Sequence, residues 1–199
     1  MAKAKEKGSL VVISGPSGVG KGTICQALLK KHPEIVCSIS ATTREKRPGE
    51  VEGVHYYFMD AEEFQDKIAH GDFLEWAMVY DHYYGTLTSA VQAQLMDGKH
   101  VILEIDTEGA KQIKAKMPEA VLIYIMPPDV KELERRLRGR STDSEETIQK
   151  RLGCYKKELE QRVYYDYIVI NRQVSETVQE IEAILHLLTE EEETGDEHE

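Results

Sequence analysis

The feature that most constrains this chain is a glycine-rich loop near its N-terminus, with the sequence GPSGVGKGT over residues 15–23. The loop follows the apolar run 10–13 and precedes a helical pattern in which Ile24, Ala27 and Leu28 share one face. A strand, a glycine loop and a helix in this order are typical of a phosphate-binding loop. The glycines let backbone N–H groups converge on one anion, and the helix N-terminus adds positive charge. The alternative, an ordinary glycine-rich turn, is disfavoured by the Gly-x-x-x-x-Gly-Lys spacing.

We therefore predict that this loop binds the phosphates of a nucleoside triphosphate, with the Lys21 ammonium reaching the outer phosphates. The candidate residues are Gly15, Pro16, Ser17, Gly18, Val19, Gly20, Lys21, Gly22 and Thr23. The position after the lysine usually carries a hydroxyl that binds Mg²⁺, and Gly22 cannot supply one. Thr23 is consequently our candidate metal ligand within the loop.

Length and composition predict one cytoplasmic domain. A chain of 199 residues fits a single domain with a substantial core. No apolar run approaches the ~20 residues that a membrane span needs, and the charged segment 1–7 lacks the apolar part of a secretory signal. The cysteines Cys25, Cys37 and Cys154 have no metal-ligand spacing and are typical of a reducing compartment.

The net charge of −11 argues against nucleic acid as a partner. Seven acidic residues and no Lys or Arg lie in the segment 190–199, which predicts a solvated, disordered tail over 189–199. Without that segment, 29 acidic residues face 25 basic ones, a charge near −4. Any anion site must therefore be made by local clusters of basic residues.

Apolar strand patterns alternate with helical patterns along most of the chain. We expect strands at 9–14, 35–40, 54–59, 73–80, 100–106, 121–126 and 167–170, and a turn at 83–86. We expect helices from the loop to 31, from 60 past 68, and at 88–97, 108–117, 129–138, 144–161 and 175–188. This order predicts an α/β protein with a parallel sheet between two layers of helices, and with ligands at the carboxyl ends of the strands.

Two intervals break that alternation and suggest separate parts. Residues 37–90 carry short aromatic strand patterns and are interpreted as an inserted β-rich subdomain. Residues 127–161 are helical but rich in arginine and poor in apolar positions, so we expect them outside the core. The core is then formed by 9–36, 91–126 and 162–188.

Two arginine clusters are candidate anion sites. Arg44 and Arg47 share a polar loop, with Tyr56 and Tyr57 soon after, and guanidinium groups bind phosphate oxygens in pairs. The alternative is a pair of solvated loop arginines, which is about equally probable for this cluster alone.

The second cluster comprises Arg135, Arg136, Arg138 and Arg140, with Arg151 on the following helix. Arg136 and Arg140 share a face if the helix continues between them. The alternative is a charged surface helix in which these arginines pair with nearby carboxylates, namely Glu132, Glu134, Glu145 and Glu146.

Together the loop and both clusters suit a reaction between two phosphorylated molecules. Lys21, Mg²⁺ and the arginines would offset the repulsion between two anions and stabilise a phosphoryl group in transfer. No catalytic base is needed when the acceptor is a phosphate, because its oxygen is already ionised at neutral pH.

The chain resembles the guanylate kinase family. The matching motifs run in register from Ser9 to Asn171 and are GPSGVGKGT, SATTREKRPGE, GVHYYF, FLEWA, YYGT, ILEID, GA, IMPP, RRLRGR and IVIN. The resemblance implies a single guanylate kinase-like domain over 1–199, with a P-loop core that holds ATP, a GMP-binding subdomain at 37–90 and a mobile lid at 127–161. It also implies the reaction of ATP with GMP or dGMP to give ADP and GDP, with Mg²⁺.

The resemblance also assigns roles by position. For the GMP phosphate it implies Arg44, Arg47, Tyr56 and Tyr84, and for the guanine Ser40, Glu75 and Thr86, with Asp106 nearby. Around ATP and the transferred phosphate it implies Lys21, Arg136, Arg140 and Arg151, with Asn171 near the adenine. A carboxylate such as Glu75 can accept from both N1–H and the amine of guanine, whereas adenine offers it an acceptor. Without the motif around it, Glu75 is as well explained as a solvent-facing residue of a strand.

Two departures from the family pattern concern the metal. The family usually has Asp-x-Asp followed by Gln, and this chain has Glu104 and Glu108 at the first and last of those positions. Glu104 still offers a carboxylate, one methylene longer, and is our second candidate Mg²⁺ ligand.

The alternatives to a GMP kinase are a non-catalytic guanylate kinase-like binding module, a kinase of a sugar phosphate, and a P-loop GTPase or motor ATPase. The retained phosphate loop and arginines disfavour the module, and Glu75 disfavours the sugar-phosphate kinase. A GTPase has no use for a second arginine-rich phosphate site. The sequence leaves the oligomeric state open, with a homo-oligomer among the options.

Overall fold

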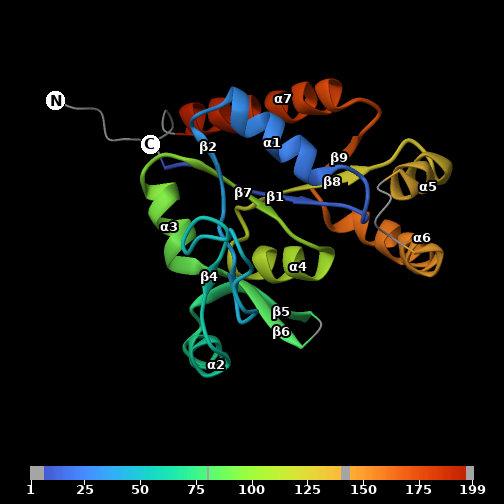
Figure 1. The fold of residues 1–199 in the computed structure, drawn as a ribbon. Coiled ribbons are helices and arrows are strands. Elements are labelled where there is room, and N and C mark those ends of the chain that lie inside the picture. The colour runs from blue at the N-terminus through green and yellow to red at the C-terminus, as the bar shows by residue number, and fades with distance from the viewer. Residues whose placement is uncertain (1–6, 80, 140–143, 196–199) are drawn as a thin grey trace. The chain divides into compact units, whose positions relative to one another are not determined.

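The computed structural model describes residues 7–79, 81–139 and 144–195. Its helices and strands alternate as expected, and the α/β class with a parallel sheet is confirmed (Figure 1). The chain divides into two compact units. Unit 1 comprises Met1–Val12 and Glu34–Val121, and unit 2 comprises Ile13–Pro33 and Leu122–Glu199. Strand β1 (Leu10–Ser14) is fully buried and is shared between them.

Unit 1 contributes the parallel strands β2 (Ile35–Cys37) and β7 (His100–Glu104), which precede β1 in the sheet order β2-β7-β1. Strands β2 and β7 are parallel, with Ile35 opposite His100. Helices α3 (Thr88–Met96) and α4 (Thr107–Lys116) flank β7 in the chain. The apolar run of β7 is buried and ends at the exposed Glu104, as a strand inside a parallel sheet does.

A second sheet lies wholly within the predicted inserted interval 37–90. Its strands are β3 (Ala41–Thr42), β4 (Tyr57–Phe58), β5 (Phe73–Val79) and β6 (His82–Leu87), in the order β4-β3-β6-β5. Helix α2 (Ala61–His70) follows β4, and the Asp60 carboxylate caps it by accepting from Glu63 N. Phe64 of α2 stacks on Phe73 at 4.2 Å between ring centroids, which gives this sheet a small core of its own.

Two expectations in this interval were wrong. The predicted turn at 83–86 is strand β6, which pairs antiparallel with both β3 and β5. The predicted strand at 54–59 shrinks to β4, with one isolated bridge between Glu52 and Tyr56. Strand β6 also pairs with β3, far earlier in the chain, and local residue preferences do not reveal such a partner.

Unit 2 contains α1 (Lys21–Lys31), β8 from Leu122 onwards (Val121–Met126), β9 (Tyr167–Ile170) and α7 (Val174–Gly195). Strands β8 and β9 are parallel, with Ile123 opposite Tyr167, and the sheet order here is β1-β8-β9. Glu182 of α7 accepts hydrogen bonds from Lys31 and from His32, which directly follows α1. These contacts fix α7 beside α1.

Helices α5 (Val130–Arg138) and α6 (Glu145–Glu160) also belong to unit 2, and a 3-10 turn, Gln161–Tyr164, follows α6. Asp129 and Ser144 cap the two helices. Contrary to our expectation, the segment has an apolar face, because every third or fourth residue meets the opposite helix. The buried residues of this α5–α6 cluster are Leu133, Leu137, Ile148 and Tyr155.

The predicted acidic tail needs a correction. Helix α7 continues to Gly195, so residues 189–195 are helical, which suits the high helix propensity of glutamate. The last four residues lie outside the described part of the chain. The predicted division into core, GMP-binding subdomain and lid does not coincide with the two units and stays a prediction.

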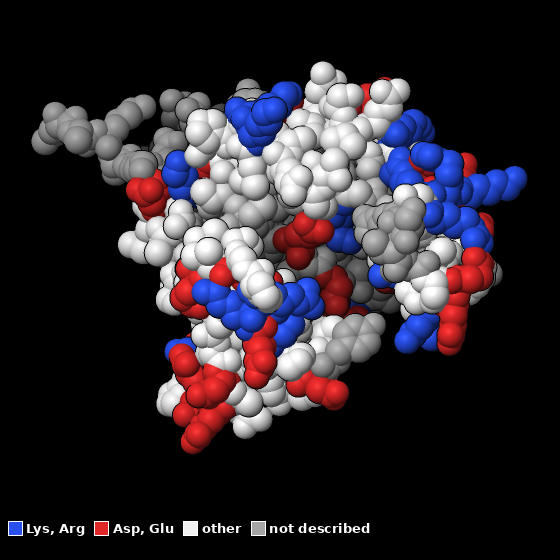
Figure 2. Space-filling model, in the orientation of Figure 1, with Lys and Arg blue, Asp and Glu red and all other residues white. Residues whose placement is uncertain are grey.

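Within the described residues, no helix is long and apolar enough to cross a membrane. On the face drawn in Figure 2, the basic side chains lie beside acidic ones and do not form a broad basic surface.

Candidate functional site

The glycine loop of unit 2 has a backbone that only glycine adopts readily. Gly15, Gly18 and Gly20 have φ values of 147°, 88° and 106°. A Cβ at Gly15 would lie 2.3 Å from the Ile125 carbonyl oxygen, and one at Gly20 would lie 2.8 Å from Asn171 Nδ2. The loop is therefore closely packed as well as left-handed, and its glycines cannot be replaced without displacing their neighbours.

Helix α1 begins directly after this loop, at Lys21. Within the described residues, no side chain caps its N-terminus, and its first turn contains no acidic residue. The positive end of its dipole is therefore suited to an anion. The Lys21 ammonium folds back over the loop and donates to the Gly15 carbonyl at 2.6 Å, so its charge lies beside that anion position.

A hollow of about 440 Å³ opens beside the loop. Five of the residues predicted to bind ATP or its metal line it, namely Gly18, Gly20, Thr23, Arg136 and Asn171. Arg135, which we had named in the second arginine cluster, also lines it, and the sequence reasoning missed the other three lining residues, Gly139, Arg172 and Val174. Arg172 and Val174 follow the carboxyl end of β9, and that position at the end of a parallel strand is the signal that could have identified them. The loop, the hollow and its lining form the P-loop site.

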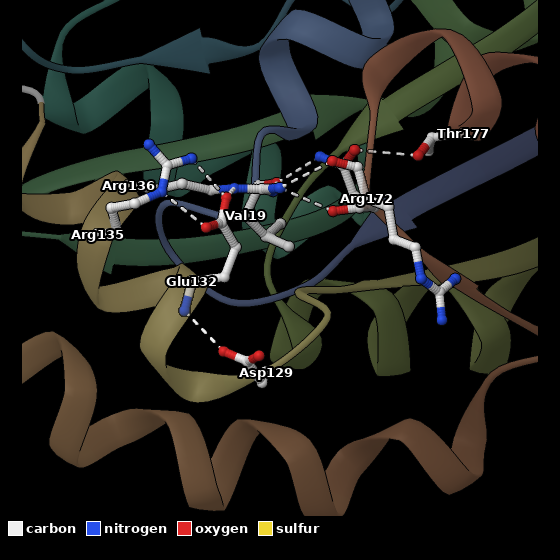
Figure 3. Close-up of polar contacts among 8 residues, drawn as sticks. Val19, Asp129, Glu132, Arg135, Arg136, Arg172 and Thr177 are labelled. Carbon is white, nitrogen blue, oxygen red and sulfur yellow. Dashed lines mark hydrogen bonds and ion pairs between the residues drawn. The ribbon is translucent and has the colours of Figure 1, made fainter.

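The polar side-chain atoms of Arg136 and Asn171 form hydrogen bonds to other residues of the protein (Figure 3). Arg136 Nη1 donates to the Val19 carbonyl at 3.0 Å, and Nη2 donates to the Asn171 carbonyl at 2.9 Å. Asn171 Nδ2 donates to the same Val19 carbonyl at 2.7 Å, while its Oδ1 accepts from Thr177 at 3.0 Å. The predicted contacts of Arg136 and Asn171 with ATP stay predictions, and both residues hold the phosphate loop.

Arg135 and Arg138 pair with carboxylates, which is the alternative that we had left open for this cluster. Arg135 makes two hydrogen bonds of 2.7 Å to Glu132, and Arg138 bonds to Glu134 and to Glu145 of α6.

These arginines hold the pKa values of Glu132 and Glu145 at about 2, because hydrogen bonds to the guanidinium groups favour the charged carboxylates. Arg151 lies half-buried on α6, and Arg140 lies outside the described residues.

In unit 1 the loop after β3 gathers the residues predicted to hold the second phosphate. Arg44 Nη2 donates to Glu50 Oε1 at 2.7 Å, and Arg47 N donates to Glu50 Oε2 at 2.8 Å. The Arg44 guanidinium also lies 5.4 Å from the centre of the Tyr56 ring. Hydrogen bonds from Arg44 and from Arg47 N hold the pKa of Glu50 at about 2. Bonding to Glu50 raises the pKa of Arg44, with a smaller contribution from Tyr84.

Glu75 lies on β5 and is buried, with an exposed fraction of 7%. Its Oε1 accepts from the hydroxyl of Thr86, on the neighbouring strand β6, at 2.6 Å. Burial raises the pKa of Glu75, and the nearby charge of Asp106 contributes in the same direction. Asp106 itself caps α4 by accepting from Gly109 N at 2.8 Å. The structure thus brings together three of the four residues expected at the guanine.

Gly109 keeps the space beside these carboxylates open, because a Cβ there would lie 3.2 Å from Glu75 Oε2 and 3.5 Å from Asp106 Oδ1. Ser40 lies half-buried between β2 and β3, and its carbonyl accepts from Tyr57 N. A contact between the Ser40 side chain and a base stays a prediction.

Strand β6 links the two groups of residues in unit 1. Tyr84 and Thr86 are two positions apart, so their side chains emerge on the same face of the strand, about 7 Å apart along it. Tyr84 contributes to the raised pKa of Arg44, and the hydroxyl of Thr86 donates a hydrogen bond to Glu75. A cationic end and a carboxylate end therefore belong to one site, which we call the sheet site.

The sequence reasoning also missed the side chains that hold β5. Gln112 of α4 donates from Nε2 to the Trp76 carbonyl at 3.0 Å and accepts from Trp76 N at 3.2 Å. Lys116 of the same helix donates to the Phe73 carbonyl at 2.5 Å. These contacts fix the backbone on both sides of Glu75. No local sequence signal marks Gln112 or Lys116, since both resemble ordinary polar residues of a surface helix.

The fold and the glycine loop define an α/β protein of the P-loop nucleotide-binding class. The family model described as guanylate kinase matches residues 7–188. A guanylate kinase of Carboxydothermus hydrogenoformans is 52% identical over 179 residues, which cover 90% of this chain and 88% of that protein. A guanylate kinase of Clostridioides difficile is 48% identical over 180 residues, again 90% of this chain and 88% of that protein.

Among solved structures, the crystal structure of guanylate kinase from Anaplasma phagocytophilum matches with a TM-score of 0.70 at 35% identity. The match covers 92% of this chain and 87% of the other. This chain therefore belongs to the guanylate kinase family.

Proposed function

We propose that this protein is a guanylate kinase that transfers the γ-phosphoryl group of ATP to GMP, and also to dGMP. Family membership supports the reaction. The observation that carries the choice of acceptor is the buried Glu75–Thr86 pair, on the same sheet as the Arg44 loop. A buried carboxylate can accept hydrogen bonds from the N1–H and the amine of guanine, and guanidinium groups can donate to the phosphate of the same nucleotide.

The transfer needs no protein base. A phosphate oxygen of GMP forms a bond to the γ-phosphorus of ATP, and the bond from that phosphorus to the β–γ bridging oxygen breaks. ADP leaves with the electron pair on that oxygen. In this proposal Lys21 and the loop N–H groups bind the donor phosphates, and Arg136, Arg140 and Arg151 serve the donor side. Arg44, Arg47, Tyr56 and Tyr84 hold the acceptor phosphate.

For Mg²⁺ we propose Thr23 and Glu104 as protein ligands. Thr23 lines the hollow of the P-loop site, and Glu104 is an exposed residue at the end of β7. Both are oxygen donors of the kind that Mg²⁺ prefers, and in kinases this ion is held largely by substrate phosphates with one or two carboxylates. The described residues contain no cluster of three His, Cys, Asp or Glu side chains that could hold a metal ion by themselves. Bound Mg²⁺ would neutralise charge on the phosphates.

A reaction of this kind belongs to purine nucleotide metabolism, and we propose the cytoplasm as its location. Of the alternatives, the binding module is disfavoured by the intact glycine loop and by the Lys21 ammonium beside it. A sugar-phosphate kinase is disfavoured because a sugar phosphate has no base for the buried Glu75–Thr86 pair to bind.

The test is an ADP-release assay with ATP and Mg²⁺ and a panel of GMP, dGMP, IMP, AMP and UMP. We expect strong turnover with GMP and dGMP only. Turnover of AMP or UMP at a kcat/KM comparable to that of GMP would contradict the proposed selectivity for guanine. An absence of turnover with every nucleotide, together with tight GMP binding, would favour the binding module.

A further inference from the structure

Two side chains that are distant from the glycine loop in sequence converge on one of its peptides, and a third side chain supports one of them. The Val19 carbonyl accepts from Asn171 Nδ2 at 2.7 Å and from Arg136 Nη1 at 3.0 Å, and Thr177 donates to Asn171 Oδ1 at 3.0 Å. Figure 3 shows Val19 between Arg136 and the segment that leads to Arg172 and Thr177. We call Val19, Arg136, Asn171 and Thr177 the Val19 clamp.

The orientation of Asn171 within the clamp follows from hydrogen-bond chemistry. The Val19 carbonyl can only accept, so the amide nitrogen of Asn171 must face it, and the amide oxygen must face Thr177. That oxygen needs a donor, because Asn171 is buried, with an exposed fraction of 2%. The hydroxyl of Thr177, which is 1% exposed, supplies the proton and shares it with the Gln173 carbonyl at 3.1 Å.

The clamp determines where the next N–H group of the loop points. In a planar trans peptide the C=O and the following N–H point in opposite directions. Fixing the Val19 carbonyl toward Arg136 and Asn171 therefore turns the Gly20 N–H to the other side of the loop. Gly20 lies against Asn171 so closely that a Cβ there would come within 2.8 Å of Nδ2, which leaves the peptide little freedom to rotate.

We infer that Thr177 is a positioning residue for the donor nucleotide: through Asn171 it orients the Val19–Gly20 peptide, so that the loop presents its N–H group to the phosphates. Thr177 reaches the loop only through Asn171 and has no role in the reaction of its own. Asn171 consequently acts by fixing the loop, whichever contacts it makes with the base. This inference rests on the proposed function for the identity of the donor, but the clamp itself would act on any nucleotide phosphate.

The test compares Thr177→Val, which keeps the shape of the side chain, with Thr177→Ser, which keeps the hydroxyl. For Thr177→Val we expect the KM for ATP and the Kd for ADP, measured by calorimetry, to rise about fivefold, the effect of one lost neutral hydrogen bond. The KM for GMP should change less than twofold. Thr177→Ser should restore both values, and Ser175→Ala, on the same turn of α7, should match the unmodified protein.

A Thr177→Val protein with unchanged affinity for ADP would overturn the inference, even if its melting temperature fell. Equal rises in the KM values for ATP and GMP would overturn it too, because they indicate general loss of structure. If Thr177→Val does not fold, Asn171→Asp serves instead, since it places a carboxylate against the Val19 carbonyl. Normal ADP binding by folded Asn171→Asp would refute the clamp.

The ADP measurement separates this inference from the proposed function. If the unmodified protein does not phosphorylate GMP, the proposed function fails, while the comparison of ADP affinities still decides whether Thr177 positions the loop.

Discussion

The P-loop site and the sheet site solve the same problem, binding of a phosphorylated ligand, by different physical means. The P-loop site relies on backbone geometry: three glycines with positive φ, an uncapped helix N-terminus and a carbonyl held by neutral and guanidinium donors. The sheet site relies on titratable side chains, with Arg44 paired to Glu50 and Glu75 buried beside Thr86. The first site is therefore sensitive to shape, and the second to charge.

The difference also appears within the sheet site itself. Glu50 is held charged, with a pKa of about 2, whereas burial raises the pKa of Glu75 and so disfavours its charged form. A carboxylate that is costly to keep charged is suited to a binding role, because a ligand that donates to it relieves the cost.

The largest effect should come from Lys21, whose ammonium lies beside the glycine loop of the P-loop site. We expect Lys21→Ala to lower kcat by about 10³-fold or more, because a cation is lost where charge develops in the transition state. The Kd for GMP, measured by calorimetry, should not change. Turnover near that of the unmodified protein would remove Lys21 from the transfer step.

The next effect should come from Glu75→Gln. The amide offers guanine one acceptor instead of two, so we expect the preference for GMP over AMP in kcat/KM to fall by about 10²-fold. If the GMP-to-AMP ratio is the same in both proteins, Glu75 does not contact the base.

The same variant should be more stable than the unmodified protein at neutral pH. A raised pKa means that the folded state binds more protons than the unfolded state, so the stability contributed by Glu75 falls as the pH rises. Denaturant unfolding at pH 4 and pH 8, on either side of the ordinary pKa of 4.5, should show that the gain from Glu75→Gln is larger at pH 8. The opposite order would contradict the assigned direction of the pKa.

A smaller effect should come from Gly20→Ala, which changes the backbone geometry of the P-loop site without changing its charge. Gly20→Ala places a Cβ against Asn171 at a φ of 106°, and we expect the KM for ATP to rise about tenfold at every pH from 6 to 9. Gly71→Ala is the matched control, because Gly71 also has a positive φ of 74° but, within the described residues, nothing lies within 4 Å of the added carbon. It should lose stability and keep its affinity for ATP.

The smallest effect should come from Glu50→Gln, which weakens the hydrogen bonds that Glu50 accepts from Arg44 and from the backbone N–H of Arg47. We expect the KM for GMP to rise two- to fivefold, in line with the loss of an ion pair at a partly exposed position. The pKa of Glu50 lies below its ordinary value of 4.5, so its contribution to stability is complete above that value and is lost as the pH falls toward 2. As the pH is lowered, the free energy of unfolding of the variant should therefore decrease less than that of the unmodified protein. A fall in the KM for GMP would contradict the expected rise and show that Glu50 competes with the phosphate for the arginines.

The P-loop site was easier to predict than the sheet site, because its features are local. The strand, the glycines and the start of α1 are consecutive in sequence. Strands β8 and β9 were also predicted at the positions observed, and the helix predicted at 129–138 is α5 with its Asp129 cap. Each depends on a short pattern of apolar residues or on one capping side chain.

The rest depends on contacts between distant residues. The pairing of Glu75 with Thr86 joins two strands, one of which we had predicted as a turn. The contact of Arg136 with ATP stays a prediction, and its place on the Val19 carbonyl requires α5 and the loop to be folded together. Thr177 and Gln112 carry no sequence signal at all, because their hydroxyl and amide gain significance only from the backbone that they meet.

The apolar contacts between α5 and α6 have a consequence for the order in which parts of unit 2 lose their structure. Leu133 and Leu137 are buried against Ile148 and Tyr155, while Arg138 bonds to Glu145 across the same pair of helices. Neither helix can open without exposing the cluster, so their backbone amides should exchange with deuterium together, as one cooperative segment. Because Leu137 also lies where a Cβ on Gly18 would be, opening of that segment also uncovers the phosphate loop.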